Sequence, residues 1–179
     1  FLCFQTVFLF LVLALYRLFE KVDIALNRTM LALVLVAVPI SFFVIFNQLY
    51  ALLLLKEEFM KTVDPIQMQT LTMALLKMYD YGNSVIGIFW GLWLIPFGQL
   101  AYKSGFIPKI IGILLILGGL AYVMDAFVFV LFPEFRSVTN MLVAVLSSIA
   151  ELSTVFWLLI KGVSEQDENG KKKQVDGGK

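Results

Sequence analysis

Residues 109–132 read KIIGILLILGGLAYVMDAFVFVLF, and the only charged side chains among them are Lys109 and Asp125. A helix needs about 20 mainly apolar residues to cross the hydrocarbon core of a bilayer. This stretch is long enough, and its two charges lie at its first residue and in its second half. It therefore predicts a transmembrane helix.

Similar apolar stretches occupy most of the remaining chain, at residues 1–19, 29–55, 81–101 and 137–160. Of the 179 residues, 60% are hydrophobic and 15% are charged, and the mean hydropathy is +0.90. A soluble domain is about 45–50% apolar and about 25% charged. The charges here cluster between the apolar stretches, so the sequence predicts an all-α, polytopic transmembrane bundle with about five spans.

A different kind of helix signal lies before the third span. Asp64 suits the N-cap, Pro65 the first helical position and Gln67 the third. We therefore predict an external helical segment over residues 65–80. Continued unbroken into the span at 81–101, this helix would measure roughly 55 Å at 1.5 Å per residue. The hydrocarbon core is only about 30 Å thick, so the first half would project from the membrane or lie along its surface.

The lysines and arginines predict the orientation, because cytoplasmic loops are enriched in them. If the spans alternate, one side of the membrane holds ten of them: Arg17, Lys21, Arg28, Lys103, Lys109, Lys161, Lys171, Lys172, Lys173 and Lys179. The other side holds four: Lys56, Lys61, Lys77 and Arg136. We expect a protein of the cell membrane whose polar, disordered tail, residues 164–179, is cytoplasmic. The basic run in this tail could contact anionic lipid.

The composition also limits the chemistry. The chain has no histidine, which removes the commonest general base and zinc ligand, and Cys3 is its only cysteine. We therefore expect no metal, no cofactor and no catalytic residue, and we expect no nucleic-acid partner. The chain starts at Phe1 inside an apolar stretch, which predicts that it begins within a longer protein.

Ionisable residues inside spans are costly, so each is a candidate functional residue. Asp125 lies in the outer half of the fourth span and Glu151 lies near the middle of the fifth. Small and polar residues share a helical face with Glu151, at Asn140, Ala144, Ser147, Ser148 and Thr154. We expect this stripe to face other helices, and our hypothesis is one polar cavity in the outer half of the bundle. The candidates for ligand binding or proton titration are Asp80, Asn83, Tyr122, Asp125, Ser147, Ser148 and Glu151.

A packing interpretation stands beside this hypothesis. Gly87 and Gly91 form a GxxxG pair on one face with Gly98, and such faces are typical of helix packing. Serines and asparagines commonly join membrane helices by hydrogen bonds, and both carboxyl groups could do the same when protonated. The tryptophans are more typical of packing or interface anchors than of a ligand cage.

Several short stretches together resemble one known family. They are GLWLIPFG at 91–98, YKSGFIP at 102–108, YVMD at 122–125, AEL at 150–152 and WLLIKGV at 157–163. They are similar to a family of bacterial multipass membrane proteins known as domain of unknown function 4386. The resemblance implies a six-helix protein, with one more helix before Phe1, and places Asp125 and Glu151 within the family's motifs. It implies no activity, cofactor or catalytic residue.

Three classes of function remain open from the residues. The first is a non-enzymatic membrane sensor, accessory protein or small-ligand-binding protein. The second is a small-solute or proton-coupled transporter that uses Asp125 or Glu151; internal prolines at 39 and 96 are weak hints of the discontinuous helices typical of transporters. The third, an intramembrane enzyme, is least supported, because no nucleophile–base pair with recognisable spacing is present. The expected partners are the lipid bilayer and another membrane protein or a second copy.

Overall fold

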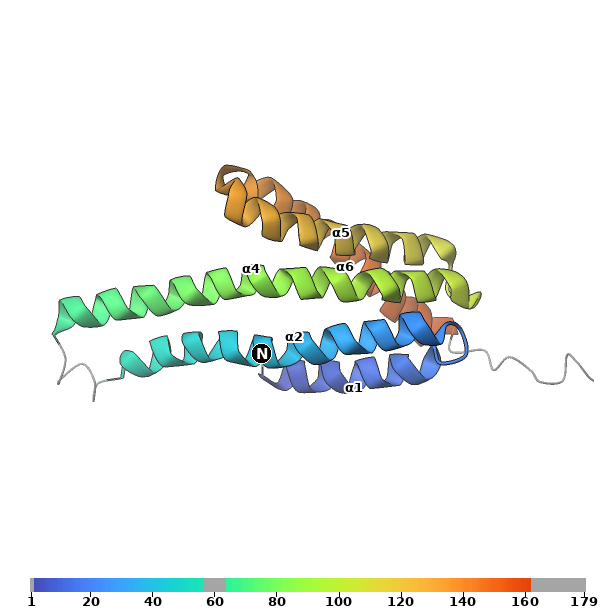
Figure 1. Ribbon diagram of the computed structural model, residues 1–179, viewed down its shortest axis with the longest axis horizontal. Coiled ribbons are helices and arrows are strands. Elements are labelled where there is room, and N and C mark those ends of the chain that lie inside the picture. Colours follow the sequence, from blue (N-terminus) through green and yellow to red (C-terminus); the bar gives the residue numbers. More distant parts are fainter. Residues whose placement is uncertain (1, 57–63, 162–179) are drawn as a thin grey trace, which may run out of the picture.

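The computed structural model describes residues 2–56 and 64–161, and this part of the chain is an all-α bundle without strands (Figure 1). Its elements are α1 (Leu2–Leu18), α2 (Ile24–Leu54), α4 (Pro65–Ser104), α5 (Lys109–Leu131), the 3₁₀ turn η1 (Pro133–Phe135) and α6 (Arg136–Lys161). Four helices, α2, α4, α5 and α6, are long and apolar enough to cross a membrane, and α1 is a shorter apolar helix of 17 residues. The predicted fold class is confirmed. The predicted tail, with Lys171–Lys173, and the charged residues 57–63 lie outside the described residues.

Capping residues fix where two long helices begin. Asp23 Oδ1 accepts hydrogen bonds from the backbone N–H groups of the second and third residues of α2, at 3.1 and 3.2 Å. For this reason α2 begins at Ile24, ahead of the Thr29 start predicted for this span. Asp64 caps α4 in the same way, as its position before Pro65 predicted. Gly105 ends α4 with a φ of 74°, a conformation that glycine adopts without steric cost.

The helix α4 is continuous over 40 residues, so residues 65–80 and 81–101 belong to one helix roughly 60 Å long. It lies beside α2, and both extend past the end of the α5–α6 pair (Figure 1). The ring of Tyr81 packs edge-on against that of Phe129 near the end of α5, with centroids 5.0 Å apart. The part of α4 before Tyr81 therefore extends beyond the end of α5. Pro39 and Pro96 interrupt neither α2 nor α4.

Glycines bring α4 and α5 into backbone contact. A Cβ added to Gly98 would lie 2.6 Å from the carbonyl oxygen of Gly112, and one added to Gly112 would lie 2.7 Å from that of Gly98. Seven residues earlier on α4 and seven later on α5, a Cβ on Gly119 would lie 2.6 Å from the carbonyl oxygen of Gly91. These reciprocal pairs define an antiparallel glycine seam. The seam does not use Gly87, because a Cβ there would meet nothing within 4 Å.

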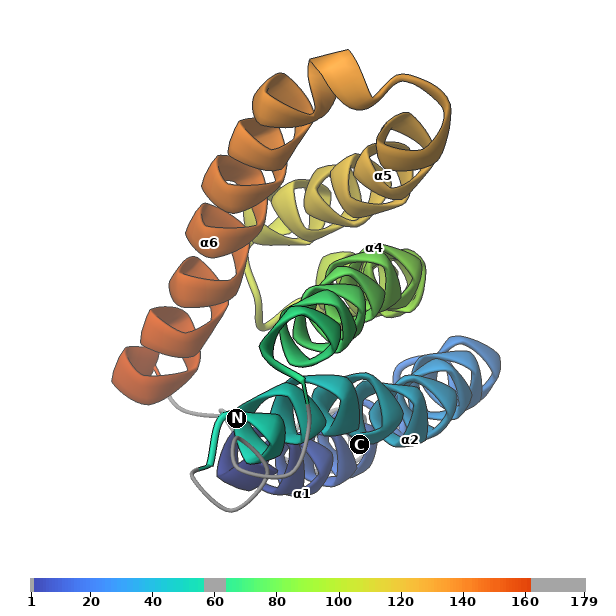
Figure 2. The same ribbon diagram turned by 90° about the vertical axis from the view of Figure 1, so that its left-hand side faces the viewer.

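The centre of the bundle is α4, with α1 and α2 on one side and α5 and α6 on the other (Figure 2). Aromatic side chains join α1 to α4: the ring of Phe8 lies 4.9 Å from that of Trp90 and 5.2 Å from that of Trp93, both edge to face. On the opposite side, Trp157 Nε1 donates a 2.8 Å hydrogen bond to the carbonyl oxygen of Phe106 in the α4–α5 turn. All three tryptophans therefore make packing or anchoring contacts. The end of the bundle that carries the α1–α2 and α4–α5 turns is called the inner end, and the opposite end is the outer end.

Candidate functional site

The seam between α5 and α6 is fixed at two points. Toward the outer end, Thr139 Oγ1 donates a hydrogen bond to Asp125 Oδ1. Nearer the middle, Gly118 allows the backbone of α6 to approach, because a Cβ on Gly118 would lie 3.3 Å from Ser147 Cα. These contacts place Asp125 and Ser147 on one seam, as the sequence hypothesis required of both.

Tyr122 lies between these two points and is half-buried. Its phenol is close enough to Ser147 for a side-chain hydrogen bond, and it interacts electrostatically with both Asp125 and Glu151. A helical side chain leans toward the N-terminus of its helix, which for α5 is the inner end. The phenol therefore points from the level of Tyr122 toward Ser147 and Glu151. The two carboxyl groups consequently lie on the same side of the bundle and not on opposite surfaces.

The two carboxyl groups do not meet. Thr139 contacts Asp125, and from Thr139 to Glu151 the helix α6 advances roughly 18 Å toward the inner end. A direct hydrogen bond cannot cover this separation. Glu151 also lies inward of Ser147, so the structure places it toward the inner half of the bundle, whereas the hypothesis placed it with Asp125 in the outer half.

Glu151 stands at the boundary between the core and the surface of the chain. Ala150, directly before it, is fully buried in the core, whereas Glu151 itself is exposed. Within the described residues, its carboxyl group takes part in no hydrogen bond or ion pair. The two basic residues of α6, Arg136 and Lys161, are at its ends. A carboxyl group thus lies well inside an apolar span without a partner, which is costly in a bilayer.

The polar stripe of α6 divides into two. Ser147 and Thr154 are buried, and their hydroxyl groups donate to backbone carbonyls one turn back on the same helix. Asn140 and Ser148 are exposed on the surface that also carries Glu151. The expectation that the stripe faces other helices therefore holds for its buried part only.

Asp80 and Asn83 lie elsewhere, on the exposed surface of α4. They flank Tyr81, which marks the outer end of α5 through its contact with Phe129. Neither side chain forms a hydrogen bond or ion pair with the α5–α6 seam in the part of the chain that the structure describes. The structure thus brings together Tyr122, Asp125, Ser147 and Glu151, and leaves Asp80 and Asn83 apart from them.

Sequence reasoning missed several buried polar residues. Gln5 is fully buried, and neither its Nε2 nor its Oε1 has a hydrogen-bond partner among the described residues. Asn27 Nδ2 donates to the carbonyl oxygen of Tyr16 at 2.6 Å, which ties α2 to the end of α1. A signal for Gln5 was available, because it shares a helical face with the apolar core residues Phe8 and Val12.

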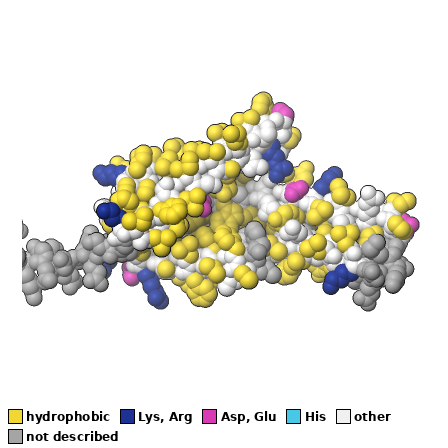
Figure 3. All heavy atoms as spheres, turned by 180° about the vertical axis from the view of Figure 1, so that it is seen from behind, with side chains coloured by type: hydrophobic (Ala, Val, Ile, Leu, Met, Phe, Trp, Pro, Cys, Tyr) yellow, Lys and Arg dark blue, Asp and Glu magenta, His cyan; other side chains and the backbone are white. Residues whose placement is uncertain are grey.

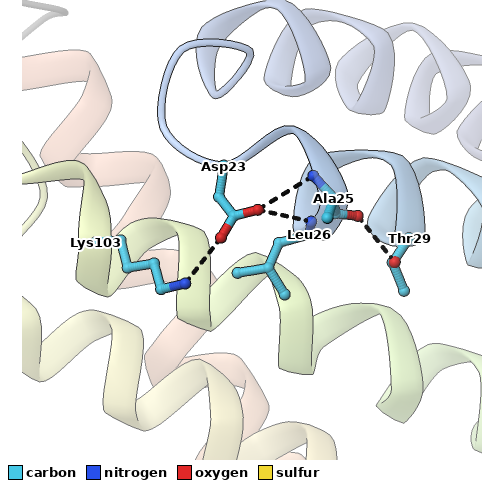
Figure 4. A network of polar contacts seen from close by, with 5 residues as sticks. All are labelled: Asp23, Ala25, Leu26, Thr29 and Lys103. Carbon is cyan, nitrogen blue, oxygen red and sulfur yellow. Dashed lines mark hydrogen bonds and ion pairs between the residues drawn. The ribbon is translucent and has the colours of Figure 1, made fainter.

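An ion pair joins two helices at the inner end (Figure 4). Lys103 Nζ lies 2.8 Å from Asp23 Oδ2, while the other carboxylate oxygen of Asp23 caps α2. The hydrogen bond from Lys103, and then that from the backbone of Leu26, lower the pKa of Asp23 below its usual range. This contact connects the first turn of α2 to the last turn of α4.

The chemistry open to the α5–α6 seam is proton exchange, hydrogen bonding and attraction of positive charge. It offers two carboxyl groups, one phenol and several hydroxyl groups, of which Thr139 already serves Asp125. No group of three or more His, Cys, Asp or Glu residues placed to hold a metal ion occurs within residues 2–56 and 64–161. The free thiol of Cys3 is exposed on α1, away from this seam.

Comparisons with known proteins identify a family for this chain, and none of the matches carries a described activity. An uncharacterized protein of the archaeon Archaeoglobus fulgidus is 34% identical over 97 residues, which cover 51% of this chain and 56% of that protein. The chain thus matches little more than half the length of this relative. No solved structure matches. A family model described as Domain of unknown function (DUF4386) matches residues 1–162. Since that match covers most of the chain and all of its helical part, the chain, an integral membrane protein, belongs to this family.

Proposed function

We propose that this protein is a non-enzymatic membrane protein that binds a small molecule at the inner part of the α5–α6 seam, and so acts as a sensor or accessory subunit. The observation that carries the proposal is the carboxyl group of Glu151, which lies within a span and has no hydrogen bond or ion pair to any residue that the structure describes. Hydrogen bonding between elements can be provided by neutral residues, as it is where Trp157 donates to the carbonyl oxygen of Phe106. A carboxyl group that no other side chain uses is better suited to a ligand than to packing.

The polar groups near Glu151 support binding more than catalysis. The hydroxyl group of Ser147 donates to a backbone carbonyl, and the phenol of Tyr122 is within reach of Ser147 and interacts electrostatically with the carboxyl group. This set can orient a hydrogen-bonding or charged group but contains no base paired to a nucleophile. The continuous courses of α2 and α4 through their prolines also differ from the broken helices typical of many transporters.

The test is ligand-induced stabilisation of the purified protein in lipid nanodiscs. Small panels of organic cations, neutral alcohols and amides, and organic anions would be compared by thermal melting. We expect at least one class to raise the melting temperature of the wild type and to lose its effect on Glu151→Gln. The matched control is Glu20→Gln, which removes an exposed carboxyl group from the α1–α2 turn. Equal stabilisation of both variants, or none of the wild type, would contradict the proposal.

Flux measurements separate the second candidate, transport, from binding alone. Any ligand found in the melting assay would be loaded into proteoliposomes with and without a pH gradient. Retention of the ligand is expected for a sensor or accessory protein. Release that depends on the gradient and on Glu151 would show that the protein is a proton-coupled transporter and not a sensor.

We also propose that the protein lies in the cell membrane with its inner end in the cytoplasm. This orientation is supported by the described basic residues at the inner end, which are Arg17, Lys21, Arg28, Lys103, Lys109 and Lys161. In a Cys3→Ser background, a cysteine at position 20 should react with an impermeant thiol reagent only after the cells are opened. Labelling of intact cells at this position would reverse the orientation.

A further inference from the structure

We propose that Glu151 binds a lipid-soluble organic cation, such as an aromatic phosphonium or ammonium ion, in exchange for a proton. The inference rests on the proposed ligand site and names the chemical class of its ligand. The exposed face of α6 opens toward the surrounding lipid, so the ligand must be soluble in hydrocarbon to reach the carboxyl group.

No positively charged side chain lies near Glu151 among the described residues. Between Asp80 and Lys103, α4 contains no charged residue, and the only charged residue of α1 is Arg17 in its last turn. On α6 itself, Lys161 lies roughly 15 Å and Arg136 roughly 22 Å from Glu151 along the helix. Nothing within the described part of the chain can therefore neutralise an ionised Glu151. A carboxylate at this depth requires a proton or a cation from outside the chain.

The surface near the carboxyl group is largely apolar. Ala150 belongs to the core cluster that contains Trp93, and both Trp90 and Tyr122 pack against the same cluster. Viewed from the side on which α6 lies, the molecule has a largely apolar surface that is hollowed near its middle (Figure 3). An apolar surface with the Tyr122 ring near one carboxylate favours a bulky cation of low hydration, because such a cation binds to a ring face as well as to the negative charge.

Binding of a cation should displace the proton of the Glu151 carboxyl group. An isolated carboxyl group in hydrocarbon is favoured in its neutral, protonated form. When a cation binds, the carboxyl group gives up this proton, which leaves to the solvent, and the carboxylate stays paired with the cation. The one titratable group that faces Glu151 from α5 is Tyr122, since Asp125 lies farther away and is bonded to Thr139. Binding should therefore release one proton per cation and should strengthen as the pH rises.

The experiment uses tritiated tetraphenylphosphonium as the probe and the full chain in nanodiscs of zwitterionic lipid. Equilibrium binding and proton release into a weak buffer would be measured between pH 6 and pH 9. We expect one proton per bound probe, and a loss of affinity of at least about tenfold in Glu151→Gln. Glu134→Gln, which removes an exposed carboxyl group from η1, should bind like the wild type. Triphenylphosphine oxide, a neutral analogue, should compete weakly.

A second variant distinguishes the loss of the charge from a loss of the folded structure. Glu151→Asp keeps the charge but shortens the side chain, so it should still release a proton on binding, with reduced affinity. Binding of the probe without proton release, or equal binding by Glu151→Gln, would overturn the inference. If neutral or anionic compounds stabilise the protein through Glu151 while the phosphonium does not bind, the ligand class is wrong and the ligand site stands. If no class acts, both proposals fail.

A second copy covering the exposed face of α6 is the competing occupant. Mass photometry of the detergent-solubilised wild type and of Glu151→Gln tests it directly. The ligand proposal expects the same oligomeric state for both. A wild-type dimer that Glu151→Gln converts to a monomer, together with no phosphonium binding, would assign Glu151 to a contact between copies and would overturn the inference.

Discussion

The glycine seam between α4 and α5 makes the most direct prediction about stability, and Gly98→Ala tests it. The added Cβ would lie 2.6 Å from the carbonyl oxygen of Gly112, and ordinary contact begins near 3.4 Å. The two helices would have to separate by about 0.8 Å at this point. Overpacking of this kind costs about 1–3 kcal/mol, while replacing glycine by alanine within a helix gains about 0.5–1 kcal/mol. The net loss should be about 1 kcal/mol, within a range of roughly 0–2.5 kcal/mol, and a loss of about 1 kcal/mol lowers the melting temperature by roughly 2–4 °C.

The matched control is Gly87→Ala on the same helix, where the added Cβ meets nothing within 4 Å. This variant should melt at or slightly above the wild-type temperature, because it gains helix propensity without a clash. Gly112→Ala should resemble Gly98→Ala, and the double variant should lose less than the sum, since one separation relieves both contacts. If Gly98→Ala melts together with Gly87→Ala, the helices are farther apart than described and the reasoning fails.

Three further predictions concern polar contacts. Thr139→Val keeps the side-chain shape but leaves Asp125 without its donor, so it should cost about 1 kcal/mol in a thermal or denaturant melt; no change would mean that the bond contributes nothing. Trp157→Phe removes the 2.8 Å hydrogen bond to the α4–α5 turn and should cost about 1 kcal/mol, while Trp157→Ala should cost more. The lowered pKa of Asp23 contributes stability that is present above its unfolded value of about 3.9 and is lost as the pH falls through the lower folded value. Asp23→Asn or Lys103→Met should therefore flatten the acid limb of the melting-temperature profile, and an unchanged limb would contradict the contribution of the ion pair.

The helical architecture could be predicted because each element has a local signal. Asp64 followed by Pro65 predicted the start of α4, and the apolar stretches predicted the long helices, since both depend on neighbouring residues only. The helix α2 begins before the predicted span at 29–55, because Asp23 acts as a cap through its conformation and no proline or apolar boundary marks it. The sequence allowed residues 65–80 and 81–101 to form one continuous helix, but it did not distinguish this from a separate external helix followed by a span.

The site was harder to predict, because it depends on which helices meet and in what register. A single sequence places Ser147 and Ser148 side by side, yet only Ser147 turns toward α5, since the direction of the α6 stripe is set by Gly118. Thr139 could not be recognised as the partner of Asp125 without that register. Glu151 was recognisable as costly, but its lack of a partner became visible only once the neighbouring helices were in place.

The two seams of α5 differ in a way that separates stability from chemistry. The α4 side is a backbone contact between glycines, where an added Cβ would clash with the opposite helix. The α6 side is joined by a hydrogen bond at Asp125 and a small-residue contact at Gly118, and inward of these Glu151 has no hydrogen bond or ion pair to any described residue. Substitutions in the glycine seam should therefore lower stability with little effect on ligand affinity at Glu151. Substitutions at Glu151 should do the reverse, because a carboxyl group that packing does not use can be removed without loss of the fold. This opposite pattern is what a binding site on a rigid α4–α5 support requires, and a purely structural carboxyl group would not produce it.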